Sequence, residues 1–354
     1  MQLQQRIKAF SILGGFMSQF VDHTPQKKDY NKINVAFFEE MKEVLQHANA
    51  HNGWFTPNHL CFALKCWSEA LTEINMNAWL SRYHIESYSK KRVAIIMAGN
   101  IPLVGFHDFL SVLLLGHRVL AKLSSNDTIL LPFLTKVLIA IEQEFEEMIT
   151  FTDEKLTDFD AVIATGSNNT ARYFEYYFDK YPNIIRKNRN SIAVLNGNET
   201  SGQLEALAND IFRYFGLGCR NVSKIYIPSN YNFDVFFNAM YSWKHVIDQN
   251  KYMNNYDYNK AVYLMSNIEL LDNEFMLLKE DTGISSPISI VFYQKYDSLA
   301  EVEEMILDQK DQIQCIISNA DISGVIPFGT AQHPDLWDYA DGVDTMGFLL
   351  KLHE

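Results

Sequence analysis

The fold of this chain is restricted most by an alternation of short apolar runs with segments of helical periodicity, which begins near residue 90. Residues 93–97 (VAIIM) form a continuous apolar run, typical of a strand buried on both faces. A break containing glycine and proline follows at 98–102, and 104–115 then has the pattern of a buried helix. Because strands that alternate with helices build βαβ units, the sequence predicts a parallel sheet. The alternation continues with strands at 118–122, 161–164 and 192–195 and with helices at 130–145 and 168–177.

The alternation restarts after residue 219 and predicts a second α/β lobe. Its expected strands are 224–227, 288–293 and 313–317, and its expected helices are 233–248, 258–266 and 299–307. Residues before 90 have helical patterns, with a helix start at Thr56-Pro57. We therefore expect a helical N-terminal segment (1–90), a cofactor-binding α/β domain (91–200), a catalytic α/β domain (201–322) and a C-terminal return segment (323–354).

Composition excludes several classes of protein. The net charge of −13 argues against nonspecific nucleic-acid binding, which needs a basic face. No apolar run is long enough to span a bilayer, and residues 1–20 lack the pattern of a secretory signal. The four cysteines show no CxxC pair and no metal-binding spacing, which favours reduced thiols in a cytoplasm.

One of these cysteines follows a glycine turn. Cys219 closes the stretch FGLGC at 215–219, between a helix-like run at 201–214 and the strand-like run that begins at 224. Two glycines let the backbone turn tightly and pass close to a ligand. A cysteine in this setting fits either an exposed nucleophile or a small buried hydrophobe. Cys61, Cys66 and Cys315 lie in apolar patterns, and we expect them to be core residues.

The common phosphate-binding fingerprints are absent, since the chain has no Walker A motif and no GxGxxG. Instead, an ordered series of loops follows the expected strands, where ligands bind in doubly wound sheets. The loops are Gly99-Asn100-Ile101-Pro102, then 122–127 (KLSSND), then Thr165-Gly166-Ser167, then 216–219 (GLGC).

This order resembles the aldehyde dehydrogenase superfamily, which has Asn-x-Pro, a Lys-Pro-Ser-Glu block, Thr-Gly-Ser and Gly-Gln-x-Cys. The likeness covers about residues 90–293, and the whole chain is most similar to the LuxC-type acyl-CoA reductases. The segment 338–344 (DYADGVD) is also typical of that branch. The resemblance implies an aldehyde-dehydrogenase-like α/β fold, with two doubly wound lobes and the active site between them.

The resemblance also implies roles for single residues. Cys219 would be the nucleophile, and Asn100 would donate a side-chain hydrogen bond to the oxyanion. Lys122 would meet the adenosine ribose, and Thr165, Gly166 and Ser167 would lie near the pyrophosphate. Glu280, seven residues before Pro287, matches the glutamate that holds the nicotinamide ribose; a solvated charge in an acidic loop is the alternative.

Two departures from the family pattern are informative. Arg186 falls where hydrolytic members keep a general-base glutamate, so water would be poorly activated and a thioacyl enzyme would survive. Ser125 replaces the glutamate of Lys-Pro-Ser-Glu. A carboxylate there would repel a 2′-phosphate, so its absence permits NADP.

The sequence and the resemblance together predict an NADPH-dependent reductase that converts an acyl-CoA to an aldehyde through a thioester on Cys219. The resemblance implies that the acyl group is a fatty acyl chain and that the product is a fatty aldehyde. An acyl-donating partner protein and a homo-oligomer are left open. A basic cluster is formed by Arg186, Lys187 and Arg189, and it would either bind CoA phosphates or be a solvated loop. The proton donor is left unassigned, and His245 is a candidate only because it lies in the second lobe. Two other functions stay open: a thiol hydrolase or acyltransferase without nicotinamide, and a catalytically degenerate binding scaffold.

Overall fold

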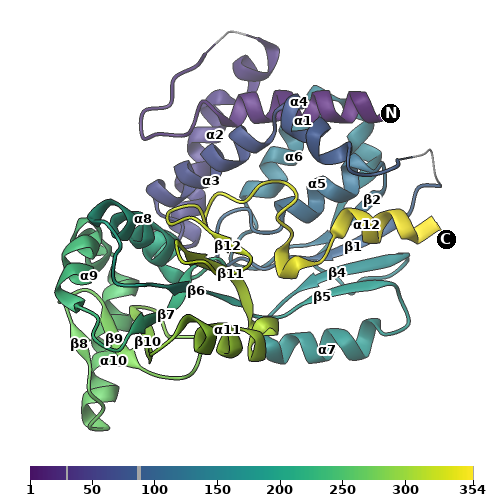
Figure 1. Ribbon diagram of the computed structural model, residues 1–354. Coiled ribbons are helices and arrows are strands. Elements are labelled where there is room, and N and C mark those ends of the chain that lie inside the picture. Colours follow the sequence, from purple (N-terminus) through teal and green to yellow (C-terminus); the bar gives the residue numbers. More distant parts are fainter. Residues whose placement is uncertain (29–30, 86–88, 354) are drawn as a thin grey trace. The chain divides into compact units, whose positions relative to one another are not determined.

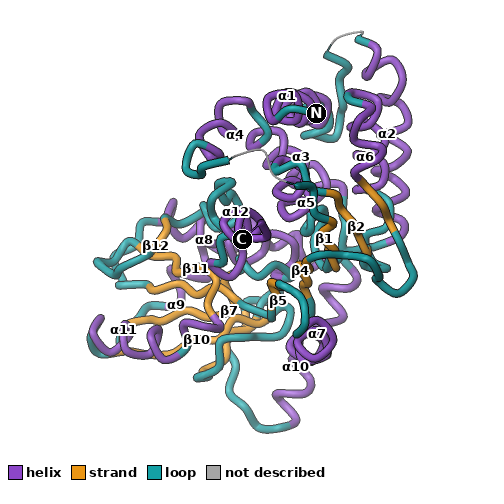
Figure 2. Tube along the Cα trace, turned by 90° about the vertical axis from the view of Figure 1, so that its right-hand side faces the viewer, coloured by secondary structure: helices purple, strands orange, loops and turns teal. Residues whose placement is uncertain are grey.

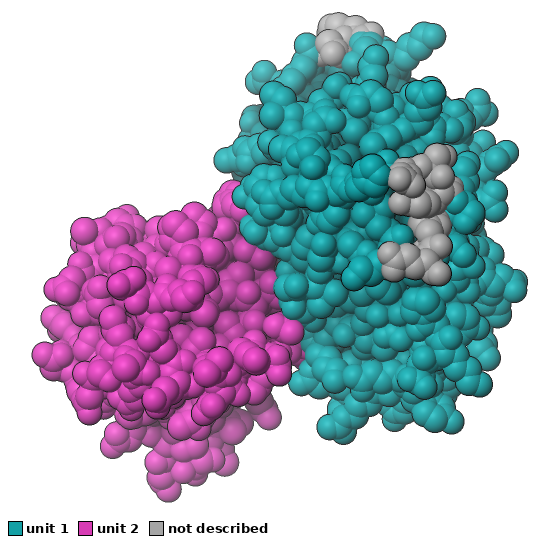
Figure 3. All heavy atoms as spheres, turned by 45° about the vertical axis from the view of Figure 1, so that its right-hand side comes forward, with its two compact units in different colours: residues 1–187, 335–354 teal, residues 188–334 magenta. Residues whose placement is uncertain are grey.

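The computed structural model describes residues 1–28, 31–85 and 89–353. The chain forms two compact units, coloured separately in Figure 3. Unit 1 comprises Met1–Lys187 together with Asp335–Glu354, and unit 2 comprises Asn188–Pro334. The expected segment 1–90 thus shares a unit with the sheet that follows it. The assignment of cofactor binding and catalysis to separate domains stays a prediction.

Unit 1 contains a sheet covered by helices on both faces (Figure 1). Its helices are α1 (Leu3–Met17), α2 (Lys32–His51), α3 (Pro57–Ala70), α4 (Glu73–Leu80), α5 (Phe106–Leu114), α6 (Leu130–Ile141), α7 (Asn168–Phe178) and α12 (Thr345–Leu350). Its strands are β1 (Arg92–Ile96), β2 (Arg118–Lys122), β3 (Ile149–Phe151), β4 (Ala161–Thr165) and β5 (Asn183–Arg186).

The unit 1 sheet is parallel throughout and has the strand order β3-β2-β1-β4-β5. Successive side chains of β1 point to opposite faces. Val93 and Ile95 join the large core formed with α1 to α6, whereas Ala94 packs with Val162 and with Phe174 of α7 on the other face. Figure 2 shows α5 and α7 on opposite sides of this sheet. Burial on both faces explains why the strands are continuous apolar runs.

Hydrogen bonds of tyrosine hydroxyl groups hold the C-terminal segment against the helices of unit 1. The Tyr339 hydroxyl accepts a hydrogen bond from Trp79 Nε1 at 2.7 Å and lies 2.6 Å from the hydroxyl of Tyr83. Tyr83 also donates to Asp344 at 2.9 Å, and Asp344 caps α12 by accepting from the Gly347 N–H. The DYADGVD motif at 338–344 therefore has a structural role, which is to fasten α12 to the helical layer.

A buried ion pair fixes the end of β5. Arg186 and Asp108 are 6% and 3% exposed, and both guanidinium Nη atoms donate to the carboxylate. Arg186 Nη2 also donates to Thr345 Oγ1 at 2.9 Å. The sequence analysis left Arg186 either as a contact for CoA phosphates or as part of a solvated loop. Neither alternative holds for Arg186, because its guanidinium is buried and its charge is paired with Asp108.

Unit 2 contains a seven-stranded sheet with the order β12-β11-β6-β7-β10-β9-β8. Its strands are β6 (Asn190–Val194), β7 (Val222–Pro228), β8 (Leu271–Asp272), β9 (Leu277–Glu280), β10 (Ile290–Tyr296), β11 (Ile313–Ser318) and β12 (Val325–Ile326). Its helices are α8 (Ser201–Phe212), α9 (Phe233–Met240), α10 (Asn250–Met265) and α11 (Leu299–Asp308). Only β8 is antiparallel to its neighbour.

Two sequence expectations need correction in unit 2. The run 192–195 does not continue the first sheet, because β6 pairs with β7 and β11, and β5 fills the expected place beside β4. An apolar run shows that a strand is buried but not which sheet it joins. The helix expected over 233–248 is α9 followed by a 3₁₀ segment, Tyr241–Asp248, and α10 begins at Asn250 rather than 258.

The buried ion pair leads to a stability prediction. Asp108→Ala would leave the Arg186 charge buried without its partner, and we expect a loss of about 3–5 kcal/mol in the free energy of unfolding. Asp108→Leu combined with Arg186→Met should lose much less. Urea unfolding followed by tryptophan fluorescence reports mainly on unit 1, which holds Trp54, Trp67, Trp79 and Trp337.

The exposed pair Lys187–Glu175, 2.7 Å apart, is the matched control for this experiment. Its loss through Glu175→Ala should cost at most about 1 kcal/mol. Equal losses from Asp108→Ala and Glu175→Ala would show that the Arg186 pair does not hold unit 1 together.

Candidate active site

The backbone before Cys219 is strained. Tyr214, Phe215 and Gly216 follow α8 with φ angles of 54°, 56° and 76°. A side chain in this left-handed region costs roughly 1–2 kcal/mol, and only glycine adopts it freely. Strain of this kind persists where the surrounding structure fixes the chain, and it clusters at functional sites. Cys219 lies between this turn and the start of β7, at an element junction as expected, and it is half-buried.

Asn221 holds this strained segment in place. Its side chain is 1% exposed, accepts from the Gly218 N–H at 2.8 Å, and donates to the carbonyls of Asp210, Ile211 and Arg213. The last carbonyls of a helix have no partner within the helix, so Asn221 satisfies the end of α8 and ties it to the turn. The sequence analysis missed this role, although an asparagine two residues after Cys219 was visible.

Ser191 fixes the Cys219 carbonyl. Its hydroxyl is fully buried in β6, donates to the Cys219 carbonyl at 3.1 Å, and accepts from the Cys315 N–H at 3.1 Å. Cys315 is buried in β11, as predicted, whereas Cys61 and Cys66 are only half-buried on α3. All four cysteines lie in the described part of the chain, and none forms a disulfide.

A buried carboxylate near the end of α8 binds the segment around residue 330. Asp210 is 0% exposed and accepts from the N–H groups of Gly329 and Ala331 at 2.6 and 3.1 Å. Burial raises the pKa of Asp210 to about 7, although the nearby Arg220 opposes this shift. Gly329 has a φ of +82°, and a Cβ there would lie 2.9 Å from the Cβ of Ala206. The segment around 329–331 can therefore pack against α8 only with glycine at 329.

A buried lysine anchors the loop that follows Glu280. Lys224 of β7 is 0% exposed; its Nζ donates to the Thr282 carbonyl at 2.8 Å and to Gln294 Oε1 at 2.7 Å. Ser223, one residue earlier, donates to the Ile284 carbonyl at 2.6 Å. The strand that leaves the Cys219 turn thus fixes residues 282–284.

The structure does not bring Glu280 next to Cys219. Cys219 precedes the amino end of β7. Glu280 is the last residue of β9, which lies two strands from β7 in the sheet, and it is in register with Tyr293 of β10 and Ile225 of β7. Glu280 is more than half exposed and lies 3.4 Å from Lys295 Nζ. Its assignment to the nicotinamide ribose stays a prediction.

In unit 1 the loops that follow β1, β2 and β4 share the carboxyl edge of the sheet, since these strands are parallel neighbours. Asn100 is exposed in the loop after β1. A Cβ on Gly99 would lie 2.6 Å from Ser124 Oγ, so this position needs glycine for the two loops to pack. Asp127 joins them further by accepting from the Leu103 N–H at 3.1 Å, and burial raises its pKa to about 6.

The remaining predicted cofactor residues lie at this same edge. Lys122 ends β2 and donates to the Asp153 and Glu154 carbonyls at 3.2 and 3.0 Å. Ser125 is exposed in the loop that follows. Thr165 ends β4, Gly166 follows, and Ser167 caps α7 by accepting from the Thr170 N–H. The dipole at the start of a helix of this length favours a phosphate group.

Three other residues considered in the sequence analysis contribute little to the site. Lys187 pairs with Glu175, and Arg189 donates to the Ile313 carbonyl at 3.2 Å. His245 is exposed in the 3₁₀ segment after α9, where its ring stacks on Trp243. Neither observation supports a catalytic role for His245.

The model of the acyl-CoA reductase (LuxC) family matches residues 18–236, more than half of the sequence. The chain belongs to the acyl-CoA reductase (LuxC) family. It is therefore an enzyme of the oxidoreductase class, and the match spans both Asn100 and Cys219. A search of curated protein sequences found no match. No helix within the described ranges is long and apolar enough to cross a bilayer.

Solved structures of aldehyde dehydrogenases have the same fold. Aldehyde dehydrogenase 21 from Physcomitrella patens, in complex with the product succinate, is similar over 100% of this chain and 85% of its own, with a TM-score of 0.68 and 11% identity. The P. syringae AldA indole-3-acetaldehyde dehydrogenase, in complex with NAD+ and IAA, matches 92% of this chain and 74% of its own, with a TM-score of 0.61 and 11% identity. KauB from Pseudomonas aeruginosa matches 91% and 77%, with a TM-score of 0.59 and 12% identity. These matches confirm the expected aldehyde-dehydrogenase-like α/β fold of this LuxC-family chain.

Lys224 gives a prediction on pH. Burial lowers the pKa of Lys224 from 10.5 to about 8, although the negative charge of Asp281, which is itself paired with Lys279, opposes this shift. Between pH 8 and 10.5 the unfolded chain therefore binds a proton that the folded chain lacks, and the folded state gains stability as the pH rises. Relative to Lys224→Met, the wild-type free energy of unfolding should rise over this range by about 3 kcal/mol.

Urea unfolding of both proteins at several pH values measures this difference. The exposed Lys310→Met is the control, and its difference from wild type should not change with pH. A difference between wild type and Lys224→Met that is also constant from pH 7 to 10.5 would refute the assignment of a buried, weakly basic lysine.

Proposed function

We propose that this LuxC-family chain reduces the thioester of an acyl-CoA to an aldehyde, with Cys219 as the nucleophile and NADPH as the reductant. The observation that supports this most is the strained turn 214–216, clamped by Asn221, which ends at a half-buried cysteine. A cysteine that served only as a small hydrophobe would not need a left-handed backbone at two bulky residues. The alternative of a catalytically degenerate scaffold gives no reason for this strain.

The proposed acylation step uses residues of this chain alone. The Cys219 thiolate attacks the thioester carbonyl, and the bond from carbon to Sγ forms as the bond from carbon to the CoA sulfur breaks. The CoA thiolate leaves and takes up a proton. Asn100 and the Cys219 N–H are the proposed donors to the oxyanion, and the loss of one such donor costs roughly 2.7–4 kcal/mol in comparable sites.

Reduction of the acyl-enzyme to an aldehyde and a free thiol needs one hydride, which carries two electrons, and one proton. A bound NADPH would supply the hydride, and with a proton from solvent this gives the aldehyde and regenerates the Cys219 thiol. The residues of unit 1 fit a dinucleotide: the strand order is that of doubly wound nucleotide-binding sheets, and a Cβ at Gly99 would fill the loop junction. AldA of the same fold is in complex with NAD+.

Particular residues of unit 1 are proposed to hold the dinucleotide. Thr165, Gly166 and Ser167 would bind the pyrophosphate at the start of α7, and Lys122 would meet the adenosine ribose. Ser125 is exposed and carries no charge, so a 2′-phosphate would meet no carboxylate from this position. This supports NADPH rather than NADH. Glu280 remains the proposed partner of the nicotinamide ribose.

The residue at the position expected for a general base supports a reductase rather than a hydrolase. Arg186 occupies it in the sequence, and its guanidinium is bound to Asp108 and Thr345. An arginine stays protonated and cannot accept a proton from water. A thiol or a hydride needs no such base, so the acyl-enzyme would react with CoA or be reduced.

Substitution of the nucleophile tests this function directly. Cys219→Ala should abolish acyl-CoA-dependent oxidation of NADPH while NADPH still binds, because only the sulfur is removed. Cys61→Ala, Cys66→Ala and Cys315→Ala are the controls and should retain turnover.

The wild-type protein, assayed with both nucleotides, should use NADPH at least as well as NADH.

Three results would count against the proposal. Turnover of the thioester without nicotinamide would indicate a thiol hydrolase or acyltransferase. Neither binding nor turnover would indicate a scaffold. Retained activity in Cys219→Ala would remove Cys219 from the mechanism.

A further inference from the structure

Four tyrosines are exposed on α7 of unit 1 and in the turn that follows this helix. Their exposed fractions are 66% for Tyr173, 81% for Tyr176, 66% for Tyr177 and 40% for Tyr181, and we call them the tyrosine face. The other side of α7 lies against β4 and β5 (Figure 1), where Phe174 and Phe178 pack into the core. The tyrosine face therefore points away from the sheet of unit 1.

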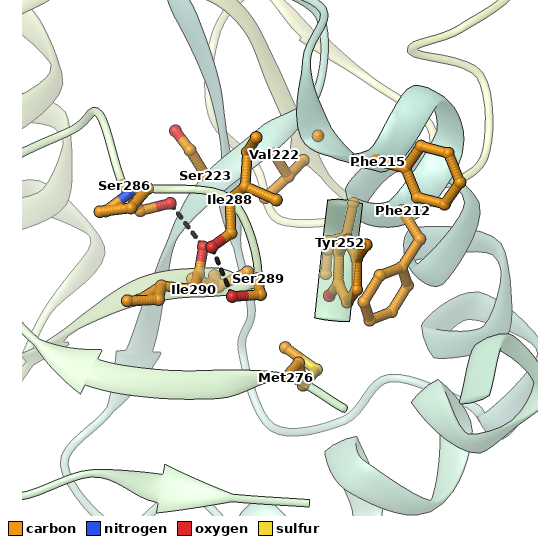
Figure 4. A pocket seen from close by; sticks show the side chains of 14 residues that line it. Phe212, Phe215, Val222, Ser223, Tyr252, Met276, Ser286, Ile288, Ser289 and Ile290 are labelled. Carbon is orange, nitrogen blue, oxygen red and sulfur yellow. Dashed lines mark hydrogen bonds between the residues drawn. The ribbon is translucent and has the colours of Figure 1, made fainter. Parts of the chain in front are cut away.

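Aromatic rings elsewhere in the chain cover one another. In unit 2, the rings of Phe212, Phe215 and Tyr252 form one wall of a pocket, which Figure 4 shows. Its free space of about 20 Å³ has room for about one water molecule, so this pocket is not a ligand site. Tyr252 is buried, and its hydroxyl donates to the Phe275 carbonyl at 2.9 Å. The tyrosines of α7 lack such cover.

The tyrosine face is large enough to form the centre of an interface. An aromatic side chain has about 150–250 Å² of surface, so the exposed fractions correspond to roughly 400–600 Å². Exposed apolar patches of this size are often functional. A standard protein interface buries about 800 Å² on each partner, and tyrosine is enriched at its centre. The tyrosine face alone thus supplies about half of this area or more.

Two residues of opposite charge flank the tyrosine face on one side. Arg172 and Asp179 are both exposed, and neither has an ion-pair partner among the residues that the structure describes. Asp179 directly follows α7 and keeps helical backbone angles, with φ −50° and ψ −31°. Seven residues are about two helical turns, so the two charges lie on the same side of the helix. They are too far apart along the axis to pair with each other.

This arrangement is complementary to itself. In two antiparallel helices related by a two-fold axis, each residue lies beside the residue equally far from the centre in the other copy. The midpoint between Arg172 and Asp179 falls beside Tyr176. With the axis there, Arg172 of each copy lies beside Asp179 of the other, and the ion pair forms twice. The two Tyr176 rings meet at the axis, and Tyr173 and Tyr177 of the two copies alternate along the contact.

We infer that this chain forms a homodimer in which the tyrosine faces of two copies pack antiparallel about a two-fold axis. Two-fold homodimers are the commonest oligomers, and they need only one self-complementary surface. Tyrosine suits such a contact, because its rigid ring provides a large area at a small loss of side-chain entropy. The inference is independent of the proposed function, since the tyrosine face contains no residue assigned to the chemistry.

Sedimentation velocity of the full-length chain, over a wide range of protein concentration, tests this dimer. The wild-type mass should approach twice 40.9 kDa as the concentration rises. Tyr176→Glu places two like charges side by side at the axis and should leave the chain monomeric. Tyr258→Glu is the matched control, because Tyr258 is 67% exposed on α10 of unit 2 and lies outside the tyrosine face. This control should dimerise as the wild type does.

A charge swap tests the antiparallel pairing itself. Arg172→Asp and Asp179→Arg each bring like charges together across the axis, and each should weaken the dimer by about 10-fold or more. The double variant restores opposite charges and should dimerise within a few-fold of the wild type. Because both residues are exposed in the single chain, these substitutions should not prevent folding, which circular dichroism verifies.

Three results would overturn the inference. A wild-type chain that stays monomeric at every concentration would leave the tyrosine face to a different partner. A dimer that persists in Tyr176→Glu would place the interface on another surface. A double variant that dimerises no better than the single charge variants would contradict the antiparallel two-fold contact.

Discussion

The geometry of the nucleophile segment depends on the hydrogen bonds of one buried side chain, that of Asn221. Its amide links three carbonyls at the end of α8 to the N–H of Gly218. Each such bond contributes about 0.5–1.5 kcal/mol, and together they are of the size needed to offset two side chains in the left-handed region. Through this clamp, the helix end, the strained turn and the start of β7 form one rigid element. Cys219 belongs to that element.

In unit 1 the comparable element is the ion pair of Arg186 with Asp108. It joins the end of β5 to α5, and through Thr345 it reaches the C-terminal helix. The same interaction that closes the fold also neutralises the group at the position where hydrolytic relatives are expected to carry a base. Structure and proposed chemistry are therefore linked, because an arginine held in this pair cannot activate water.

Many elements of the fold could be predicted from the sequence, and the predictions that were wrong or absent have physical causes. The apolar runs of β1, β2 and β4 depend on local pattern, and they form as expected. The run at 192–195 was assigned to the wrong sheet because pairing partners depend on contacts distant in sequence. The sequence does not show that Arg186 is buried in an ion pair, because its partner, Asp108, is 78 residues away. The roles of Asp210, Lys224 and the Tyr339 motif also could not be predicted, because their partners are distant in sequence.

The fate of the acyl-enzyme tests the account most directly. Cys219 is acylated with palmitoyl-CoA, excess thioester is removed, and the protein is divided among buffer alone, buffer with CoA and buffer with NADPH. We predict that the adduct persists in buffer, returns to palmitoyl-CoA with CoA, and yields the aldehyde with NADPH. Rapid release of palmitic acid in buffer alone would contradict the account, since it would show that another group activates water.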